Sequence, residues 1–148
     1  MMRQRLFVVL RAVPIGWGTL LLLAYLLEHP VLRWVTPILG VQWLATAGLA
    51  LDCMALAATG WVLGRLNRPD SLLGVLSFAA TLTFWDFTPV VAVNIPWLLH
   101  LAANALRDSV YLSSLLTTAA SHALLFGSLI AGGLLSRPPS KPVSIMAR

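Results

Sequence analysis

Long apolar runs, separated by short polar segments, restrict what this chain can become. The run from Ser109 to Leu135 contains no Asp, Glu, Lys or Arg, and the run from Val41 to Gly64 contains one, Asp52. An apolar stretch of about 20 residues is long enough for an α-helix to cross the hydrocarbon core of a bilayer. Lipid is therefore the expected solvent for most of this chain.

The overall composition argues against a single soluble domain. Of 148 residues, 59% are hydrophobic and only 10% are charged, whereas a soluble domain carries roughly a quarter charged residues. The mean hydropathy is +0.86. A chain of this length cannot hide so much apolar surface in one water-facing core, so the composition indicates a membrane protein.

The net charge of +5 raises the question of nucleic-acid binding, and the positions of the cations argue against it. Lysine and arginine occur at the ends of apolar runs rather than along one helical face. That distribution is typical of topology determinants and of contacts with phosphate head groups. The expected partners are the lipid bilayer and other membrane subunits or a second copy of the chain, with no nucleic acid.

The apolar runs predict an all-α integral membrane protein with a single four-helix transmembrane domain over residues 1–135. The predicted spans lie at about residues 6–27, 41–64, 71–93 and 109–135. Prolines and a terminal glycine interrupt the segment Glu28–Gly40, which is expected to be a loop. The Pro-rich, basic segment 136–148 is expected to be a disordered cytoplasmic tail.

Residues 94–108 have two interpretations. Polar and aromatic residues recur there at helical spacing, with leucines and alanines covering the remaining surface. That pattern favours a short helix at about residues 95–107 that lies in the plane of the membrane interface. A fifth membrane span is the competing interpretation.

The distribution of positive charge decides between these interpretations and predicts the orientation. With four spans, one side of the membrane holds eight cationic residues: Arg3, Arg5, Arg11, Arg65, Arg68, Arg137, Lys141 and Arg148. The other side holds only Arg33 and Arg107. An excess of cations marks the cytoplasmic side, and a fifth span would weaken the asymmetry. We therefore expect four spans with both termini in the cytoplasm, in a membrane taken to be a bacterial inner or plasma membrane.

Asp52 and His122 are the residues within the predicted spans that raise a functional question. Asp52 lies near the centre of residues 41–64, and His122 lies at the centre of residues 109–135. Both spans run in the same direction, so the two side chains are expected at the same depth. A charge at the bilayer centre costs at least about 2.5–3.5 kcal/mol, which favours a paired or neutral Asp52.

Small and hydroxylated residues surround both positions along the predicted helices. The second span carries a face of Ala45, Gly48, Asp52, Ala55 and Thr59, and the fourth carries a seam of Ser114, Thr118, Ser121, Leu125, Ser128 and Gly132. Small residues allow membrane helices to approach closely. A supporting polar layer is expected from Thr81, Thr118 and Ser121, with Thr118 one turn before His122.

An intramembrane pair of Asp52 and His122 has a functional and a structural interpretation. As a functional pair it would relay a proton, hold a coupling ion or gate a narrow path. As a structural pair it would fix the register of two helices through a hydrogen bond. The structural interpretation is favoured about two to one, because perturbed groups mark functional sites only statistically.

Acids and histidines at the outer side form a weaker candidate for a metal site. The predicted topology places Glu28, His29, Asp86, His100 and Asp108 near that interface. Carboxylates and imidazoles can bind a divalent cation, and two histidines can ligate haem. The spacing carries no metal signature, and Asp108 is better explained as the N-cap of the last span. We expect no cofactor.

The residues favour a non-enzymatic membrane subunit over other classes of function. Loops are short and no nucleotide loop, zinc signature or nucleophile elbow is present, which favours an accessory, scaffold or assembly subunit of a membrane complex, or a homo-oligomer. A small proton- or ion-coupled transporter or channel using Asp52 and His122 is the alternative. An intramembrane enzyme using the outer carboxylates and His100 ranks third.

Overall fold

The computed structural model describes residues 2–68, 70–84, 99–100, 102–104 and 108–136. Its helices are α1 (Met2–Leu39), α2 (Val41–Leu66), α3 (Ser71–Phe84) and α5 (Ser109–Leu135). No strand occurs in the described ranges. The prediction of an all-helical protein is therefore confirmed for this part of the chain.

Three of these helices are apolar and long enough to cross a membrane. The qualifying segments are Arg3–Leu27, Trp43–Leu66 and Ser109–Leu135, close to three of the predicted spans. The apolar segment of α3, Ser71–Thr83, is shorter, and the rest of the span predicted at 71–93 lies outside the described residues. The structure thus indicates a multi-pass membrane protein.

The segment between the first two predicted spans is helical, so the expected loop at Glu28–Gly40 is wrong. α1 continues through Pro30 and Pro37 as one helix of 38 residues, about 57 Å long at 1.5 Å per residue. Proline has a φ angle that suits a helix and removes only one backbone hydrogen bond, so it can kink a helix without ending it. The chain turns at Gly40, whose φ of 75° favours glycine.

The segment predicted as an interfacial helix at 95–107 is helical where the structure describes it, at residues 99–100 and 102–104. Its depth in a membrane stays a prediction. Ser136, expected in the disordered tail, is instead buried as the C-cap of α5. Its backbone N–H donates to the carbonyl of Gly132 at 3.1 Å, which closes the last turn of the helix. Residues 137–148 lie outside the described part.

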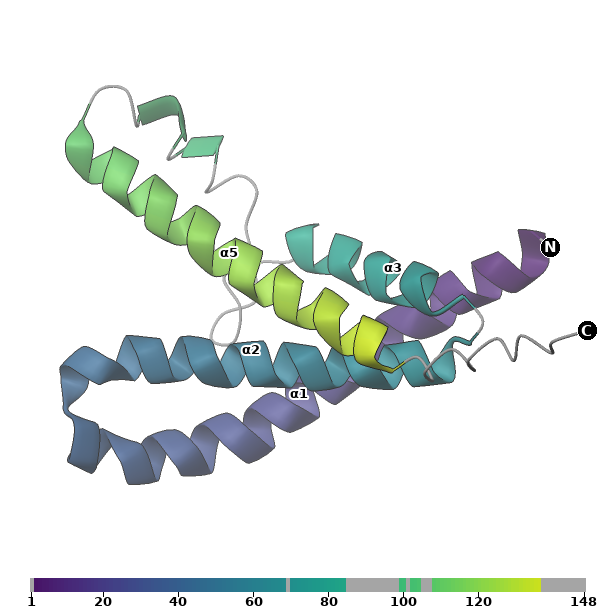
Figure 1. The fold of residues 1–148 in the computed structure, drawn as a ribbon, viewed down its shortest axis with the longest axis horizontal. Helices are drawn as coiled ribbons and strands as arrows, with labels where there is room; N and C mark the ends of the chain where they lie inside the picture. Colours follow the sequence, from purple (N-terminus) through teal and green to yellow (C-terminus); the bar gives the residue numbers. More distant parts are fainter. Residues whose placement is uncertain (1, 69, 85–98, 101, 105–107, 137–148) are drawn as a thin grey trace, which may run out of the picture.

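The helices meet at one end of the molecule and separate toward the other. α1 and α2 are antiparallel neighbours, and α5 runs parallel to α2 (Figure 1). The start of α1, the end of α2, the start of α3 and the end of α5 gather at the same end (Figure 1). Toward its own N-terminus α5 diverges from α2 (Figure 1). We call the shared end the basic end, because Arg11 and Arg68 make contacts between helices there.

The ring of Phe78 on α3 packs against Gly16 on α1 and holds these two helices together. A Cβ atom on Gly16 would overlap the ring of Phe78, which is fully buried. Trp17 packs edge-on against the same ring, with ring centroids 5.7 Å apart and an interplanar angle of 82°. Aromatic pairs prefer this T-shaped arrangement, so the pair fixes the position of α3 against α1.

Glycines also allow α2 and α5 to approach through their backbones. A Cβ on Gly60 would overlap the carbonyl of Leu129, one on Gly64 would overlap Ser136, and one on Gly132 would overlap the carbonyl of Ala57. Small residues four apart, as at Gly60 and Gly64, are typical of such crossings between membrane helices. We call this contact the glycine crossing.

We expect Gly60→Ala to destabilise the protein by about 1–3 kcal/mol, because the added methyl group meets rigid backbone of α5. Gly48→Ala on the same helix is the matched control, since nothing lies within 4 Å of its added Cβ. That variant should be neutral or more stable by up to about 1 kcal/mol through helix propensity. The free energy of unfolding, measured by titrating SDS into mild detergent, checks both. Equal stability of the two variants would contradict the glycine crossing.

Candidate functional site

Asp52 lies in the middle of α2, on the face of that helix that enters the core. Leu56, Thr59 and Leu63 follow on the same face, and all three are buried. Thr59 satisfies its hydroxyl within the helix by donating to the carbonyl of Ala55 at 2.8 Å. Asp52 itself is half-buried, and its Oδ1 atom is shielded from solvent.

His122 lies on the buried face of α5, together with Leu125, Leu129, Gly132 and Gly133. Its Nδ1 is 2.7 Å from the backbone carbonyl of Thr118. A carbonyl oxygen only accepts hydrogen bonds, so Nδ1 carries the proton and donates. In the neutral imidazole Nε2 then holds the lone pair, and that atom is buried with no hydrogen-bond partner among the residues that the structure describes.

The register of α2 and α5 places the two residues at similar levels. At the glycine crossing Gly60 meets Leu129 and Gly64 meets Ser136. With the contact of Ala57 and Gly132 included, and continued toward the N-termini at equal rise, this register puts position 52 level with roughly positions 121–127. The helices separate in that direction (Figure 1), and the described interactions contain no hydrogen bond between Asp52 and His122.

The rotation of α2 about its own axis sets the direction of Asp52 relative to α5. Ala57, Gly60 and Gly64 face α5, and their average direction is roughly 110° around the helix from Asp52, at 100° per residue. Asp52 thus points toward the core rather than straight at α5. Of the small-residue face predicted on α2, the second half, Asp52, Ala55 and Thr59, borders the core. The glycine crossing lies on the neighbouring face of α2, which carries Ala57, Gly60 and Gly64.

The residues of the predicted supporting layer are all half-buried. The hydroxyl of Thr81 donates to the carbonyl of Phe78 at 2.8 Å, and that of Ser121 donates to the carbonyl of Thr117 at 2.9 Å. Thr118 contacts His122 through its backbone carbonyl rather than its side chain. The hydroxyl groups of Thr81 and Ser121 are thus satisfied within their own helices. The contribution of these residues to helix packing is their small size.

The arrangement can accept a proton at a buried position. The Nε2 lone pair of His122 is a base in a water-poor environment, and a shielded carboxylate oxygen lies on the neighbouring helix. An imidazole and a carboxylate at similar levels on neighbouring helices can share a proton, a water molecule or a small cation. This chemistry depends on both groups and distinguishes the site from a purely apolar interface.

The residues of the outer metal candidate have separate structural surroundings where they are described. The Asp108 side chain accepts from the backbone N–H of Val110 at 2.9 Å, which confirms the predicted N-cap of α5. His100 packs against Tyr111, with ring centroids 6.4 Å apart. In the described part no three His, Cys, Asp or Glu side chains converge. Asp86 and the side chains of Glu28 and His29 lie outside it, so the metal site stays a prediction.

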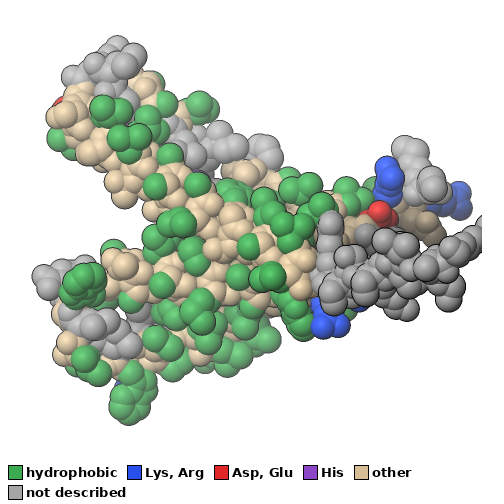
Figure 2. Space-filling model, in the orientation of Figure 1, with side chains coloured by type: hydrophobic (Ala, Val, Ile, Leu, Met, Phe, Trp, Pro, Cys, Tyr) green, Lys and Arg blue, Asp and Glu red, His purple; other side chains and the backbone are tan. Residues whose placement is uncertain are grey.

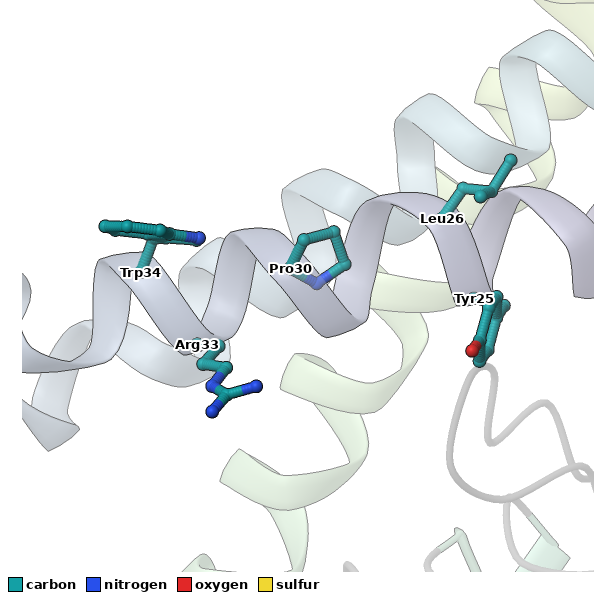
Figure 3. A pocket seen from close by; sticks show the side chains of 5 residues that line it. All are labelled: Tyr25, Leu26, Pro30, Arg33 and Trp34. Atoms are coloured by element: carbon teal, nitrogen blue, oxygen red, sulfur yellow. The ribbon is translucent and has the colours of Figure 1, made fainter.

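An open pocket near the C-terminal end of α1 does not form a converging site. It is lined by Tyr25, Leu26, Pro30, Arg33 and Trp34, all from one helix. Tyr25 and Arg33 extend below the helix in Figure 3, whereas Leu26 and Trp34 extend above it. Divergent side chains cannot enclose a ligand, and exposed aromatic and arginine side chains are typical of a membrane interface.

The basic end contains a polar contact that the sequence did not predict. Arg11 donates from Nε and Nη2 to Oδ1 of Asn67, at 3.2 Å and 2.8 Å, and from Nη2 to the carbonyl of Leu66. Asn67 is 1% exposed and donates from Nδ2 to the carbonyl of Leu63 at 3.0 Å. Arg11 thereby caps the C-terminal end of α2.

A second contact joins the same turn to α5. Arg68 donates from Nη2 to the carbonyl of Ser136, and the hydroxyl of Ser136 donates to the carbonyl of Gly133 at 2.6 Å. Helix C-termini leave carbonyl groups without partners, and cations there also complement the helix dipole. The two arginines therefore tie the ends of α2 and α5 to α1 and to the turn between α2 and α3.

Neither a known protein family, nor a curated protein, nor a solved structure matches this chain. The functional interpretation consequently depends on the geometry and chemistry of the described residues.

We expect Asn67→Ala to destabilise the protein by about 1–3 kcal/mol, because it removes the main acceptor of the half-buried Arg11. Ser77→Ala is the matched control, since its hydroxyl donates only within α3, to the carbonyl of Leu73, and its loss should cost less than about 0.5 kcal/mol. Thermal unfolding in detergent measures the difference. A loss in Asn67→Ala no larger than in the control would show that the contact does not hold α1 to α2.

Proposed function

We propose that this protein is a non-enzymatic subunit of a membrane assembly, whose partners are other membrane subunits or a second copy of itself. The observation that carries the proposal is how little of its membrane helices the chain covers. Within an apolar window of 18 residues in each of the three segments, only 17%, 33% and 28% of the residues are buried in the structure. The remaining surface is available to lipid and to partner helices.

The first half of α5 is the part of that surface best suited to a partner helix. It diverges from α2 (Figure 1), and Ser113 and Thr117 are exposed on it, with Ser121 half-buried. Each hydroxyl donates to a carbonyl of its own helix, at 2.9 Å in all three cases. The stripe therefore consists of small side chains whose hydroxyl hydrogens are already bonded within α5. Small side chains permit close approach of another helix in lipid.

The proposed topology has four spans with both termini in the cytoplasm of a bacterial inner membrane. Its support is the basic end, where contacts of Arg11 and Arg68 gather the start of α1 and the ends of α2 and α5. On the face seen in Figure 2, blue side chains lie mostly at this end, whereas the rest is green and tan. Cations concentrated at one end favour a cytoplasmic position.

Cysteine crosslinking tests whether the stripe on α5 meets a partner. In a Cys53→Ala background, Thr117→Cys should form crosslinks in native membranes, either to itself or to a distinct subunit identified by mass spectrometry. Ala119→Cys is the control, because it is exposed at the same depth on the opposite side of α5 and should crosslink at least about fivefold less. Equal crosslinking at both positions, or none at Thr117, would contradict assembly through this stripe.

A second candidate function is a small proton- or ion-coupled transporter or channel that uses Asp52 and His122. The observation that favours it is the buried Nε2 of His122, a base without a hydrogen-bond partner in the described structure, at a level close to Asp52. A path between helices of one copy would be narrow, so this function also calls for more than one copy. Crosslinking at Thr117 alone therefore does not separate the two candidates.

Proton flux into liposomes separates them. If the site relays protons, Asp52→Asn should reduce flux at least about tenfold, because an amide cannot take up or release the proton, while the unfolding temperature stays near that of the wild type. Asp70→Asn is the control, since Asp70 lies at the basic end and away from the candidate path. Unchanged flux in Asp52→Asn, or absence of flux in the wild type, would exclude the relay.

A further inference from the structure

A pocket of about 430 Å³ opens at the basic end, between the first three turns of α1 and the turn that joins α2 to α3. Its lining residues are Arg3, Gln4, Phe7, Val8, Arg11, Arg68 and Asp70. Gln4, Phe7, Val8 and Arg11 recur at helical spacing, so one face of α1 forms one wall. Arg68 and Asp70 come from the opposite wall.

The charge of the pocket favours an anion. Three guanidinium groups and one carboxylate line it, which leaves a net charge of two positive units. Arg3 and Arg68 are exposed, whereas Arg11 and Asp70 are half-buried. No ion pair between Asp70 and these arginines occurs among the described residues, so their charges are not neutralised within the pocket wall.

Arg11 is held in place before any ligand arrives. Its Nε and Nη2 groups bond to Asn67 and to the carbonyl of Leu66, and its guanidinium lies 5.6 Å from the centre of the Phe7 ring. None of the hydrogen bonds found in the described ranges uses its Nη1 group. Arg11 can therefore donate to a phosphate oxygen from Nη1, and the exposed guanidinium groups of Arg3 and Arg68 beside it can add the N–H donors that match phosphate oxygens.

The position of the pocket favours a membrane lipid as the source of that phosphate. Arg11 is level with Asn67, just past the end of α2, so the residues before Arg11 extend beyond α2. Two residues earlier, Arg65 of α2 lies over the ring of Trp61, 4.9 Å from its centroid, and tryptophan and arginine are both common at the membrane interface. Phe7 and Val8 add an apolar wall beside the arginines. We propose that this pocket binds the phosphate of an anionic phospholipid head group.

Native mass spectrometry with added lipid tests the proposal on the full chain in detergent. Wild-type protein should retain phosphatidylglycerol in preference to phosphatidylcholine, and Arg3→Gln and Arg68→Gln should each weaken its Kd about fivefold. Arg5→Gln and Arg65→Gln are the matched controls, because both arginines are exposed and neither lines the pocket. The controls should change the Kd less than twofold.

Equal losses in pocket variants and controls would overturn the proposal, because general surface attraction would then explain the binding. Inorganic phosphate at millimolar concentration is the second probe. If it fails to displace phosphatidylglycerol, the lipid is the ligand; if it displaces the lipid and Arg3→Gln abolishes this effect, the phosphate site stands and its source is the soluble anion. An unfolding temperature within about 2 °C of wild type for Arg3→Gln shows that its effect is on binding.

Discussion

The close contact between the backbones of α2 and α5 is the constraint on which the rest of the structure depends. Lipid is as apolar as leucine, so membrane helices gain little from burying leucine against one another and associate through close packing instead. Gly60, Gly64 and Gly132 provide that packing, since a side chain at any of them would overlap the facing helix. The crossing fixes both the register and the rotation of the two helices.

Polar contacts at the basic end connect the ends of the helices that the glycine crossing brings together. Arg11 and Arg68 supply donors to carbonyl groups at the ends of α2 and α5, where the helices themselves leave carbonyls without partners. The same arginines contribute positive charge on the side expected to face the cytoplasm. One set of residues thus has a structural effect and an electrostatic effect, and the proposed phospholipid pocket arises where the two coincide.

The register and rotation set by the crossing determine how Asp52 and His122 lie relative to each other. Asp52 and His122 come to similar levels because α2 and α5 are parallel, yet the rotation of α2 turns Asp52 toward the core. The Oδ1 atom of Asp52 and the Nε2 atom of His122 are both shielded from solvent, one on each helix. Assembly and proton transfer are therefore compatible candidates for the same helices.

Much of the fold could be predicted because hydropathy and helix capping are local properties. The predicted bounds of α5, 109–135, equal the observed ones, α2 was placed within two residues, and Asp108 was identified as an N-cap. The loop expected at Glu28–Gly40 was wrong because proline weakens a helix locally without deciding whether it continues. The spacing of Gly60 and Gly64 was a readable signal for the glycine crossing, whereas Arg11 and Asn67 are 56 positions apart and share no periodic pattern.

The sequence by itself determined that lipid surrounds most of this chain, where its long helices lie and which polar residues fall at their centres, because each of these depends on neighbouring residues alone. Only the tertiary structure decided which faces meet. A helix can rotate about its own axis without changing its hydropathy, and the rotation of α2 is set by where its glycines find the backbone of α5. That rotation places Asp52 beside the core, and the divergence of α5 from α2 (Figure 1) leaves Ser113 and Thr117 exposed on the first half of α5.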